Sequence, residues 1–301
     1  MIRKASHAGS WYSSSGPELA SQLDSWLDEA KTELESNGAS LDGVRAIIAP
    51  HAGYRFSGRT AGYSYAGLRA VSSSIKRIYV LGPSHHVHST KCMLTLADRL
   101  DTPLGPLKVD KEEITRLSRL ENFTMWSSIQ EDEDEHSVEM QLPYIKRAMA
   151  GNESYMVVPI TVGSITFAQE RMVGELLAAC IDNSENAVVI SSDFCHWGSR
   201  FRYQYLIDST VPIHESIKRL DHQGMELIES KDHKRFSTYL KSFQNTICGR
   251  HPIGVLLGVL DSMASKDRMV VQFVHYEQSS PCATMKDSSV SYAAALITMR
   301  V

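Results

Sequence analysis

At three places in this chain, a short apolar run rich in β-branched residues ends in a turn and then a histidine. The segments are residues 46–54, 78–86 and 188–196. Apolar runs of this length that stop at Gly, Pro or Ser are typical of strands buried inside an α/β protein. In open α/β sheets, ligands bind in the crevice outside the carboxyl ends of the strands. If the three strands are neighbours in one sheet, the pattern predicts both a fold and a site.

Helical periodicity and strand-like runs alternate along the rest of the chain. Helices are expected at residues 17–37, 58–70, 110–120, 136–149 with a break near Pro143, 167–181, 212–230, 232–243 and 254–264. Further strands are expected within 92–109, at 156–162, and as an antiparallel pair at 269–276 and 290–299. The alternation predicts a three-layer α/β sandwich, in which helices cover both faces of a central, mostly parallel or mixed sheet. No linker-like tract interrupts residues 1–301, so a single domain is expected.

Composition excludes some partners and locations for this protein but does not indicate a particular function. The net charge of −4 and a pI near 6.3 argue against nucleic acid as a partner, because its backbone attracts a basic face. No signal peptide and no transmembrane segment is apparent. The five scattered cysteines include no CxxC pair, which favours reduced thiols and a cytoplasmic location. The acidic run at residues 131–135 is interpreted as a solvated helix N-terminus.

Candidate chemistry gathers at the ends of the three predicted strands. His51 lies within a tight Pro–His–Ala–Gly turn, although a lone histidine is more often a packed or surface residue. Neighbouring side chains on an extended segment point in opposite directions, so at most one of His85 and His86 should face a given metal, and His85 is favoured. Asp193 and His196 have three interpretations: a carboxylate that orients a general base, two metal ligands, or an Asp that caps the backbone beside a buried His.

Two further segments carry candidate groups. His136 and Glu139 lie on one face of the expected helix. They are interpreted as residues that hydrogen-bond to metal ligands, as a pair that polarises the substrate, or as an ordinary polar pair at a helix N-terminus. Cys248 stands near Arg250 in a polar segment before an apolar helix. That thiol is either a nucleophile or soft ligand with a lowered pKa, or an inert buried cysteine.

Seven motifs in order resemble the Memo family (mediator of receptor-driven cell motility). They are residues 7–12 (HAGSWY), 49–54 (APHAGY), 81–86 (LGPSHH), 132–137 (DEDEHS), 191–198 (SSDFCHWG), 245–252 (NTICGRHP) and 287–294 (DSSVSYAA). The family's fold is similar to that of class III extradiol ring-cleaving dioxygenases, which hold Fe(II) with two histidines and a carboxylate. The resemblance therefore implies one Memo-like domain over residues 1–301.

The same resemblance implies roles for individual residues. His51 and His85 match the histidine ligands, Cys248 the third ligand, and His196 the catalytic histidine, with Asp193 lining the site. A thiolate in place of the carboxylate favours a softer or redox-active ion, iron or copper, over ordinary ring cleavage.

Two functions from different classes follow. The first is metal-dependent redox chemistry, in which O₂ or another small molecule binds at the metal and His196 transfers a proton. The second is the function of a non-enzymatic signalling adaptor that binds phosphotyrosine-type receptor peptides. The resemblance implies that such an adaptor acts together with cytoskeletal regulators in cell motility. Zinc hydrolysis at His51, His85 and Asp193 is a weaker third. The residues expected to bind substrate or peptide are Trp11, Tyr12, Tyr54, His86, His136, Glu139 and Trp197.

Overall fold

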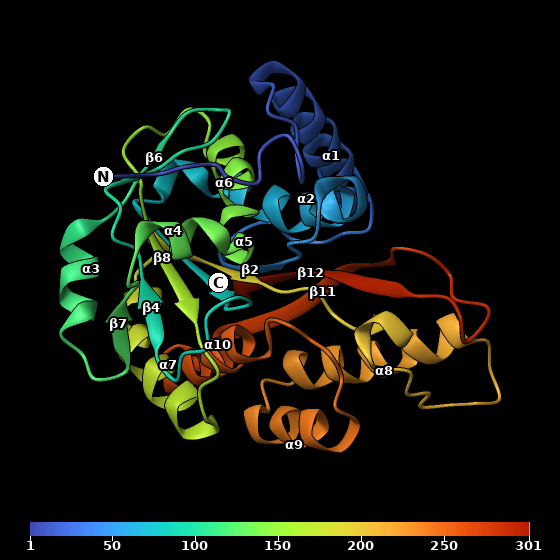
Figure 1. Cartoon of the computed structure of the whole chain (residues 1–301). Helices are drawn as coiled ribbons and strands as arrows, with labels where there is room; N and C mark the ends of the chain where they lie inside the picture. Colours follow the sequence, from blue (N-terminus) through green and yellow to red (C-terminus); the bar gives the residue numbers. More distant parts are fainter. Residues whose placement is uncertain (301) are drawn as a thin grey trace.

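A mixed β-sheet forms the centre of the computed structural model, which describes residues 1–300 (Figure 1). Its strands are β2 (Val44–Ala49), β3 (Arg77–Pro83), β4 (Cys92–Leu94), β7 (Phe123–Met125), β8 (Met156–Val162), β9 (Asn186–Ser191), β10 (His196–Trp197), β11 (Met269–Gln278) and β12 (Ser289–Met299). Within the described residues the order is β10-β12-β2-β9-β3-β8-β4-β7, and β11 pairs with β12. A smaller sheet joins β1 (Ile2–Arg3), β5 (Arg99–Leu100) and β6 (Leu107–Lys108).

The three strands predicted from the histidine pattern are parallel neighbours. β9 lies between β2 and β3 and pairs with both, in the registers Ile48↔Ile190 and Leu81↔Ile190. The predicted antiparallel pairing of the last two strands is also present. The expectation for residues 92–109 was incomplete, since this stretch supplies β4 to the main sheet and β5 and β6 to the smaller one.

Helices cover both faces of the sheet. They are α1 (Gly16–Ser36), α2 (Tyr54–Ala70), α3 (Lys111–Ser118), α4 (Ile129–Asp134), α5 (His136–Glu139), α6 (Leu142–Ala148), α7 (Phe167–Asp182), α8 (Ile213–Glu229), α9 (His233–Phe243) and α10 (Arg250–Ser262), with 3₁₀ turns η1 (Ser72–Ser74), η2 (Ser199–Phe201) and η3 (Lys266–Arg268). α1, α2 and α6 lie on one side and α7 and α10 on the other, with α8 and α9 beyond them (Figure 1). The predicted three-layer sandwich is therefore confirmed.

Local sequence explains where the helices begin, end and break. Ser15 caps α1 by accepting the backbone N–H of Glu18, and Pro17 stands in the first turn, where a missing N–H costs nothing. The buried face of α1 repeats every three or four residues, at Leu19, Leu23, Leu27, Ala30 and Leu34. The break expected near Pro143 falls at Met140–Gln141, and Pro143 then starts α6.

Close backbone contact joins the two helices beneath the sheet. A Cβ on Gly174 of α7 would lie 2.5 Å from the carbonyl carbon of Gly258 on α10. Neither backbone can give way, so only glycine allows this approach. The contact fixes α10, whose N-terminus follows Cys248. None of the helices in residues 1–300 combines the length and apolar character that a membrane span requires.

Candidate metal centre

Three candidate side chains stand at equivalent places on the sheet edge. His51, His85 and Asp193 each lie two residues beyond the end of β2, β3 and β9, respectively. Because these strands are parallel neighbours, their carboxyl ends bring the three side chains together. His196 departs from this pattern, because it lies on β10, which pairs antiparallel with β12.

The hydrogen bonds around His51 fix its tautomer. Ser191 Oγ donates to the carbonyl of Ser137 at 2.7 Å and accepts from Nε2 of Gln141 at 3.0 Å. The Ser191 proton is thus in use, so the 2.7 Å contact between His51 Nδ1 and Ser191 Oγ has the imidazole as donor. Burial, and then the charge of a neighbouring histidine, hold the pKa of His51 well below its usual 6.5. His51 is neutral, with the lone pair of Nε2 available.

His85 is held in the same way by a buried carboxylate. Its Nδ1 lies 2.9 Å from Oε1 of Glu135, and its backbone N–H donates to Oε2 at 2.5 Å. Burial would raise the pKa of Glu135, but the hydrogen bond and charge of His85 outweigh burial and leave that pKa far below its usual 4.5. Glu135 is therefore ionised, fixes Nδ1 of His85 as the donor and leaves Nε2 free.

Cys248 completes the cluster from the segment before α10. Its Sγ lies 3.0 Å from His51 Nε2 and accepts the backbone N–H of Asp193 at 3.2 Å. One donor atom from each of His51, His85 and Cys248 lies within 4.8 Å of the others. Burial, and then the charge of Asp193, raise the pKa of the Cys248 thiol well above its usual 9.0. Without a metal it is a neutral thiol, which donates to His51 Nε2.

Asp193 and His196 do not form the hydrogen-bonded pair that was one of the three interpretations of their spacing, and the alternative of a capping Asp fits better. Asp193 Oδ1 instead accepts the backbone N–H groups of His51 at 2.8 Å and Ala52 at 3.4 Å, so the carboxylate holds the turn after β2. His196 is held through its backbone N–H, which donates to Thr246 Oγ1 at 2.7 Å. Within residues 1–300, Nε2 of His196 is buried without a hydrogen-bond partner.

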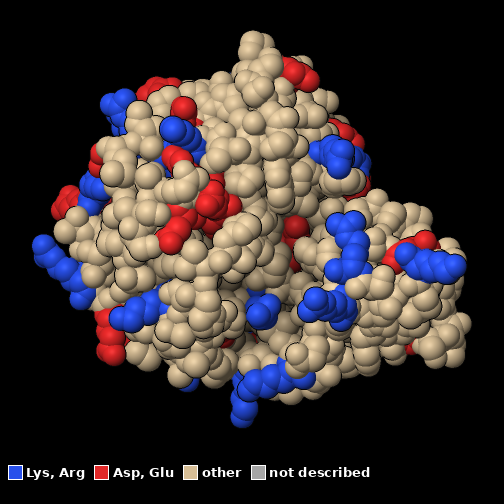
Figure 2. All heavy atoms as spheres, viewed as in Figure 1, with Lys and Arg blue, Asp and Glu red and all other residues tan. Residues whose placement is uncertain are grey.

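A cavity of about 370 Å³ opens over this cluster. His51, His85, Asp193 and His196 line it together with others, among them Trp11, His136, Arg200, Phe201 and Tyr292. The guanidinium of Arg200 lies 4.6 Å from the centroid of the Phe201 ring. On the face that Figure 2 shows, acidic and basic side chains are interspersed around a central hollow. The cavity thus combines imidazoles, aromatic walls and a guanidinium.

Two of the residues expected to bind substrate, Trp11 and His136, line the cavity, and their rings lie 4.5 Å apart. The other five do not line it: Tyr12, Tyr54, His86, Glu139 and Trp197. Tyr12 and Tyr54 are core residues whose hydroxyls donate to Glu139 Oε1 at 2.8 Å and to the carbonyl of Met140 at 2.7 Å.

The remaining three are also placed elsewhere. Trp197 is fully buried and donates its indole N–H to the carbonyl of Tyr205 at 3.0 Å. His86 is exposed, and its ring lies 6.2 Å from that of His136 without lining the cavity. Glu139 is fully buried, and its carboxylate is used by His7 and Arg3.

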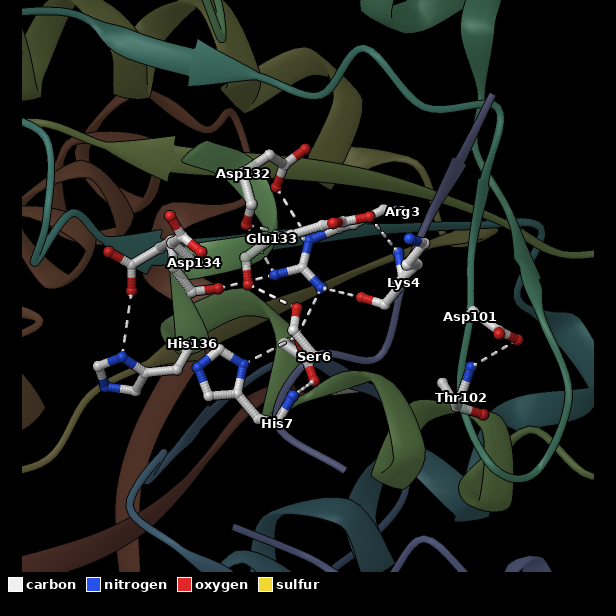
Figure 3. A network of polar contacts seen from close by, with 12 residues as sticks. Arg3, Lys4, Ser6, His7, Asp101, Thr102, Asp132, Glu133, Asp134 and His136 are labelled. Atoms are coloured by element: carbon white, nitrogen blue, oxygen red, sulfur yellow. Dashed lines mark hydrogen bonds and ion pairs between the residues drawn. The ribbon is translucent and has the colours of Figure 1, made fainter. Parts of the chain in front are cut away.

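The acidic run begins at a helix N-terminus as expected, with Glu131 and Asp132 in the first turn of α4, but the expectation that the run is solvated was wrong for most of it. Asp132, Glu133 and Glu135 are all buried. Each has a partner: the guanidinium of Arg3 binds the Asp132 carboxylate (Figure 3), the backbone N–H of Lys4 donates to Glu133, and His85 binds Glu135. The Arg3 guanidinium also binds the Glu139 carboxylate and the carbonyl of Glu135. This Arg3 cluster anchors the segment that carries Glu135 against His85.

Sequence reasoning missed three residues that orient the candidate ligands: Glu135, Ser191 and Gln141. Two signals were available. Glu135 directly precedes His136 at the end of the acidic run, and Ser191 is the last residue of a strand whose edge was already assigned to the site. Gln141 carries no local signal, because its contact with Ser191 joins positions 50 residues apart.

The protein is a mixed α/β protein with a candidate His–His–Cys metal centre. The order of the strands brings the two histidines to one sheet edge, and the cysteine lies beside them. Residues 3–296 match the family model Memo, described as Memo-like protein. Protein MEMO1 of Homo sapiens is 44% identical over 302 aligned positions, which cover 99% of this chain and 98% of that protein. The protein memo-1 homolog of Caenorhabditis elegans is 41% identical, over 98% of this chain and 82% of that protein. The chain belongs to the Memo family.

Among solved structures, the uncharacterised protein JW3007 from Escherichia coli K12 superposes with a TM-score of 0.48 at 14% identity. The match covers 82% of this chain and 98% of that one.

Proposed function

We propose that this protein binds a redox-active metal ion, iron or copper, at His51, His85 and Cys248. The observation that carries the proposal is the pair of fixed tautomers. Ser191 and Glu135 each occupy an Nδ1, so both imidazoles keep the Nε2 lone pair beside the Cys248 sulfur. Metal-binding histidines characteristically use the second ring nitrogen in this way.

The donor set suits these ions. Thiolate and imidazole together favour iron, copper or zinc over the hard ions that prefer carboxylates. A bound iron or copper ion would supply one-electron chemistry and a site for O₂ or another small molecule. Cys248 gives up its proton on binding, while Asp193 holds the turn that carries His51. His196 lines the cavity and its buried Nε2 has no partner among the described residues, which supports it as the group that would move a proton.

Metal analysis of the full chain, prepared without a histidine tag and loaded anaerobically with Fe(II) or Cu(I), tests the proposal. We expect about one ion per chain, and an anomalous scattering peak in crystals at about 2.0–2.3 Å from the two Nε2 atoms and the sulfur. A peak at the exposed His86 and His88, or a chain that retains neither ion, would contradict it.

A second function has its own support in the cavity wall. Trp11 and Phe201 offer aromatic faces, and Arg200 stands beside Phe201 as a cation for a phosphate. An aromatic face beside a cation is what binding of a phosphotyrosine-type receptor peptide requires. A protein that binds such a peptide would act in cytoplasmic signalling to the cytoskeletal regulators of cell motility. Calorimetry with phosphorylated and plain forms of one tyrosine peptide decides. Equal affinities would remove this function and leave the metal proposal standing.

The buried Glu135 yields a sharper test of the metal site. Glu135→Gln keeps the shape but removes the charge that orients His85, so we expect metal affinity to fall by about 10- to 100-fold. Asp134→Asn makes the same chemical change at the adjacent exposed residue and is expected to leave the affinity unchanged. Competition against a chelator of known affinity measures both. Equal affinities in the two variants would show that the carboxylate does not support the ligand.

A further inference from the structure

A second pocket lies on the other side of the segment that carries Cys248. It has a volume of about 780 Å³ and shares no lining residue with the cavity at the metal centre. Its walls come from the start of α7, from α9, and from the N-terminus of α10. The proposed function uses none of these lining residues.

The centre of this pocket is a carboxylate held between two imidazoles. Glu170 Oε2 lies 2.8 Å from Nε2 of His233, and Oε1 lies 2.7 Å from Nδ1 of His251. The carboxylate sits over Gly254 of α10, where a Cβ would approach Oε2 to 2.5 Å, so glycine makes the space. Burial would raise the pKa of Glu170, but the hydrogen bonds of His233 and His251 lower it overall.

This arrangement does not resemble a metal site. In the described residues, Glu170, His233 and His251 do not form one of the groups whose donor atoms all lie within 4.8 Å of one another. Both carboxylate oxygens already accept hydrogen bonds from ring nitrogens. The hydrogen bonds from the two histidines therefore stabilise the negative charge of Glu170, and neither carboxylate oxygen is left free to bind a cation.

The remaining charges of the pocket are positive. Lys241 and Arg250 are exposed at its rim, and neither forms an ion pair within 4 Å in residues 1–300. The N-terminus of the 13-residue helix α10 adds a partial positive charge, and no side chain caps it. His233 is 8% exposed, and its Nδ1 has no hydrogen-bond partner among the described residues. The ring of Phe167 lies 4.4 Å from that of His233 and gives the pocket an apolar wall.

We propose that this pocket binds the oxyanion group, phosphate or carboxylate, of a small molecule. Lys241, Arg250 and the start of α10 meet the charge, while the hydrogen bond from Nδ1 to Glu170 holds His251 in the pocket wall. Glu170 holds both imidazoles in the wall and does not touch the anion. Phe167 faces any apolar part of the molecule. The proposal is independent of the metal at the first site.

Calorimetry on the metal-free full chain, with inorganic phosphate and with benzoate as probes, tests this site and distinguishes the two sources of oxyanion. We expect at least one probe to bind, and the variant Lys241→Ala/Arg250→Ala to bind it about tenfold more weakly, because two charged contacts are removed. Lys234→Ala/Arg235→Ala removes two exposed charges from the same α9 helix outside the pocket and serves as the matched control. The control is expected to stay within about twofold of the parent.

Three outcomes would overturn the proposal. The first is that neither probe binds at about 10 mM, which corresponds to no useful affinity. The second is an equal loss in both double variants, which would indicate attraction by net charge alone. The third is unchanged binding in Lys241→Ala/Arg250→Ala, which would place the anion elsewhere, such as beside Arg200. All four substituted side chains are exposed, so thermal unfolding should show that both variants remain folded.

Discussion

Cys248→Ser should reduce the affinity for Fe(II) or Cu(I) by about a hundredfold or more, because a serine hydroxyl stays protonated and is a poor ligand for either ion. The side chain is almost the same size, so the fold should be retained. Cys180→Ser, in the half-buried part of α7, makes the same change away from the site and should not alter the affinity. Chelator competition measures all three proteins.

The pH dependence separates loss of a ligand from loss of shape. Burial raises the pKa of the Cys248 thiol well above its usual 9.0, so the metal-free protein carries that proton at neutral pH. Binding must release it, and the parent's affinity should therefore rise about tenfold per pH unit through the neutral range. Cys248→Ser should lose most of this slope. A variant with the parent's affinity and slope would show that sulfur is not a ligand.

The sheet could be predicted from the sequence because its signal is local. Apolar runs of four or five residues ending at Gly, Pro or Ser predicted β2, β3 and β9 within two residues of their observed ends. Parallel order then brings His51, His85 and Asp193 together without further information. Cys248 is different, because no periodic pattern leads from its segment to the sheet edge. Its place beside His51 was implied only by the family resemblance.

The errors share one physical cause, which is that sequence does not show what lies opposite a polar or aromatic group. The acidic run looked solvated because the cation that buries it, Arg3, is more than a hundred residues away. Tyr12 and Tyr54 were expected in the wall of the cavity over the histidines, but they line a neighbouring pocket and the core, because aromatic rings serve cores and sites equally. The hydroxyl partners that tie them into the core, Glu139 and Met140, are again distant in sequence.

Arg3→Met should be the most destabilising single change, with a loss of about 3–5 kcal/mol in the free energy of unfolding. Arg3 is 1% exposed, and its guanidinium pairs with Asp132 at 3.0 Å and with Glu139 at 2.7 Å. Methionine fills similar space but leaves two buried carboxylates without their cation. Arg99→Met, at an exposed position on β5, is the matched control and should cost no more than about 0.5 kcal/mol. Urea unfolding measures both.

The pH dependence of that loss identifies its cause. Burial would raise the pKa of Glu139, but the hydrogen bond of His7 and the charge of Arg3 bring it from 4.5 down to about 2. In the parent, the stability that Glu139 contributes is complete above pH 4.5 and is lost only as the pH falls towards 2. In Arg3→Met, burial acts without the guanidinium and raises that pKa, so the folded variant takes up a proton as the pH falls. The deficit should therefore shrink between about pH 7 and pH 5. A deficit that stays constant across that range would mean that Arg3 acts through packing and not through its charge.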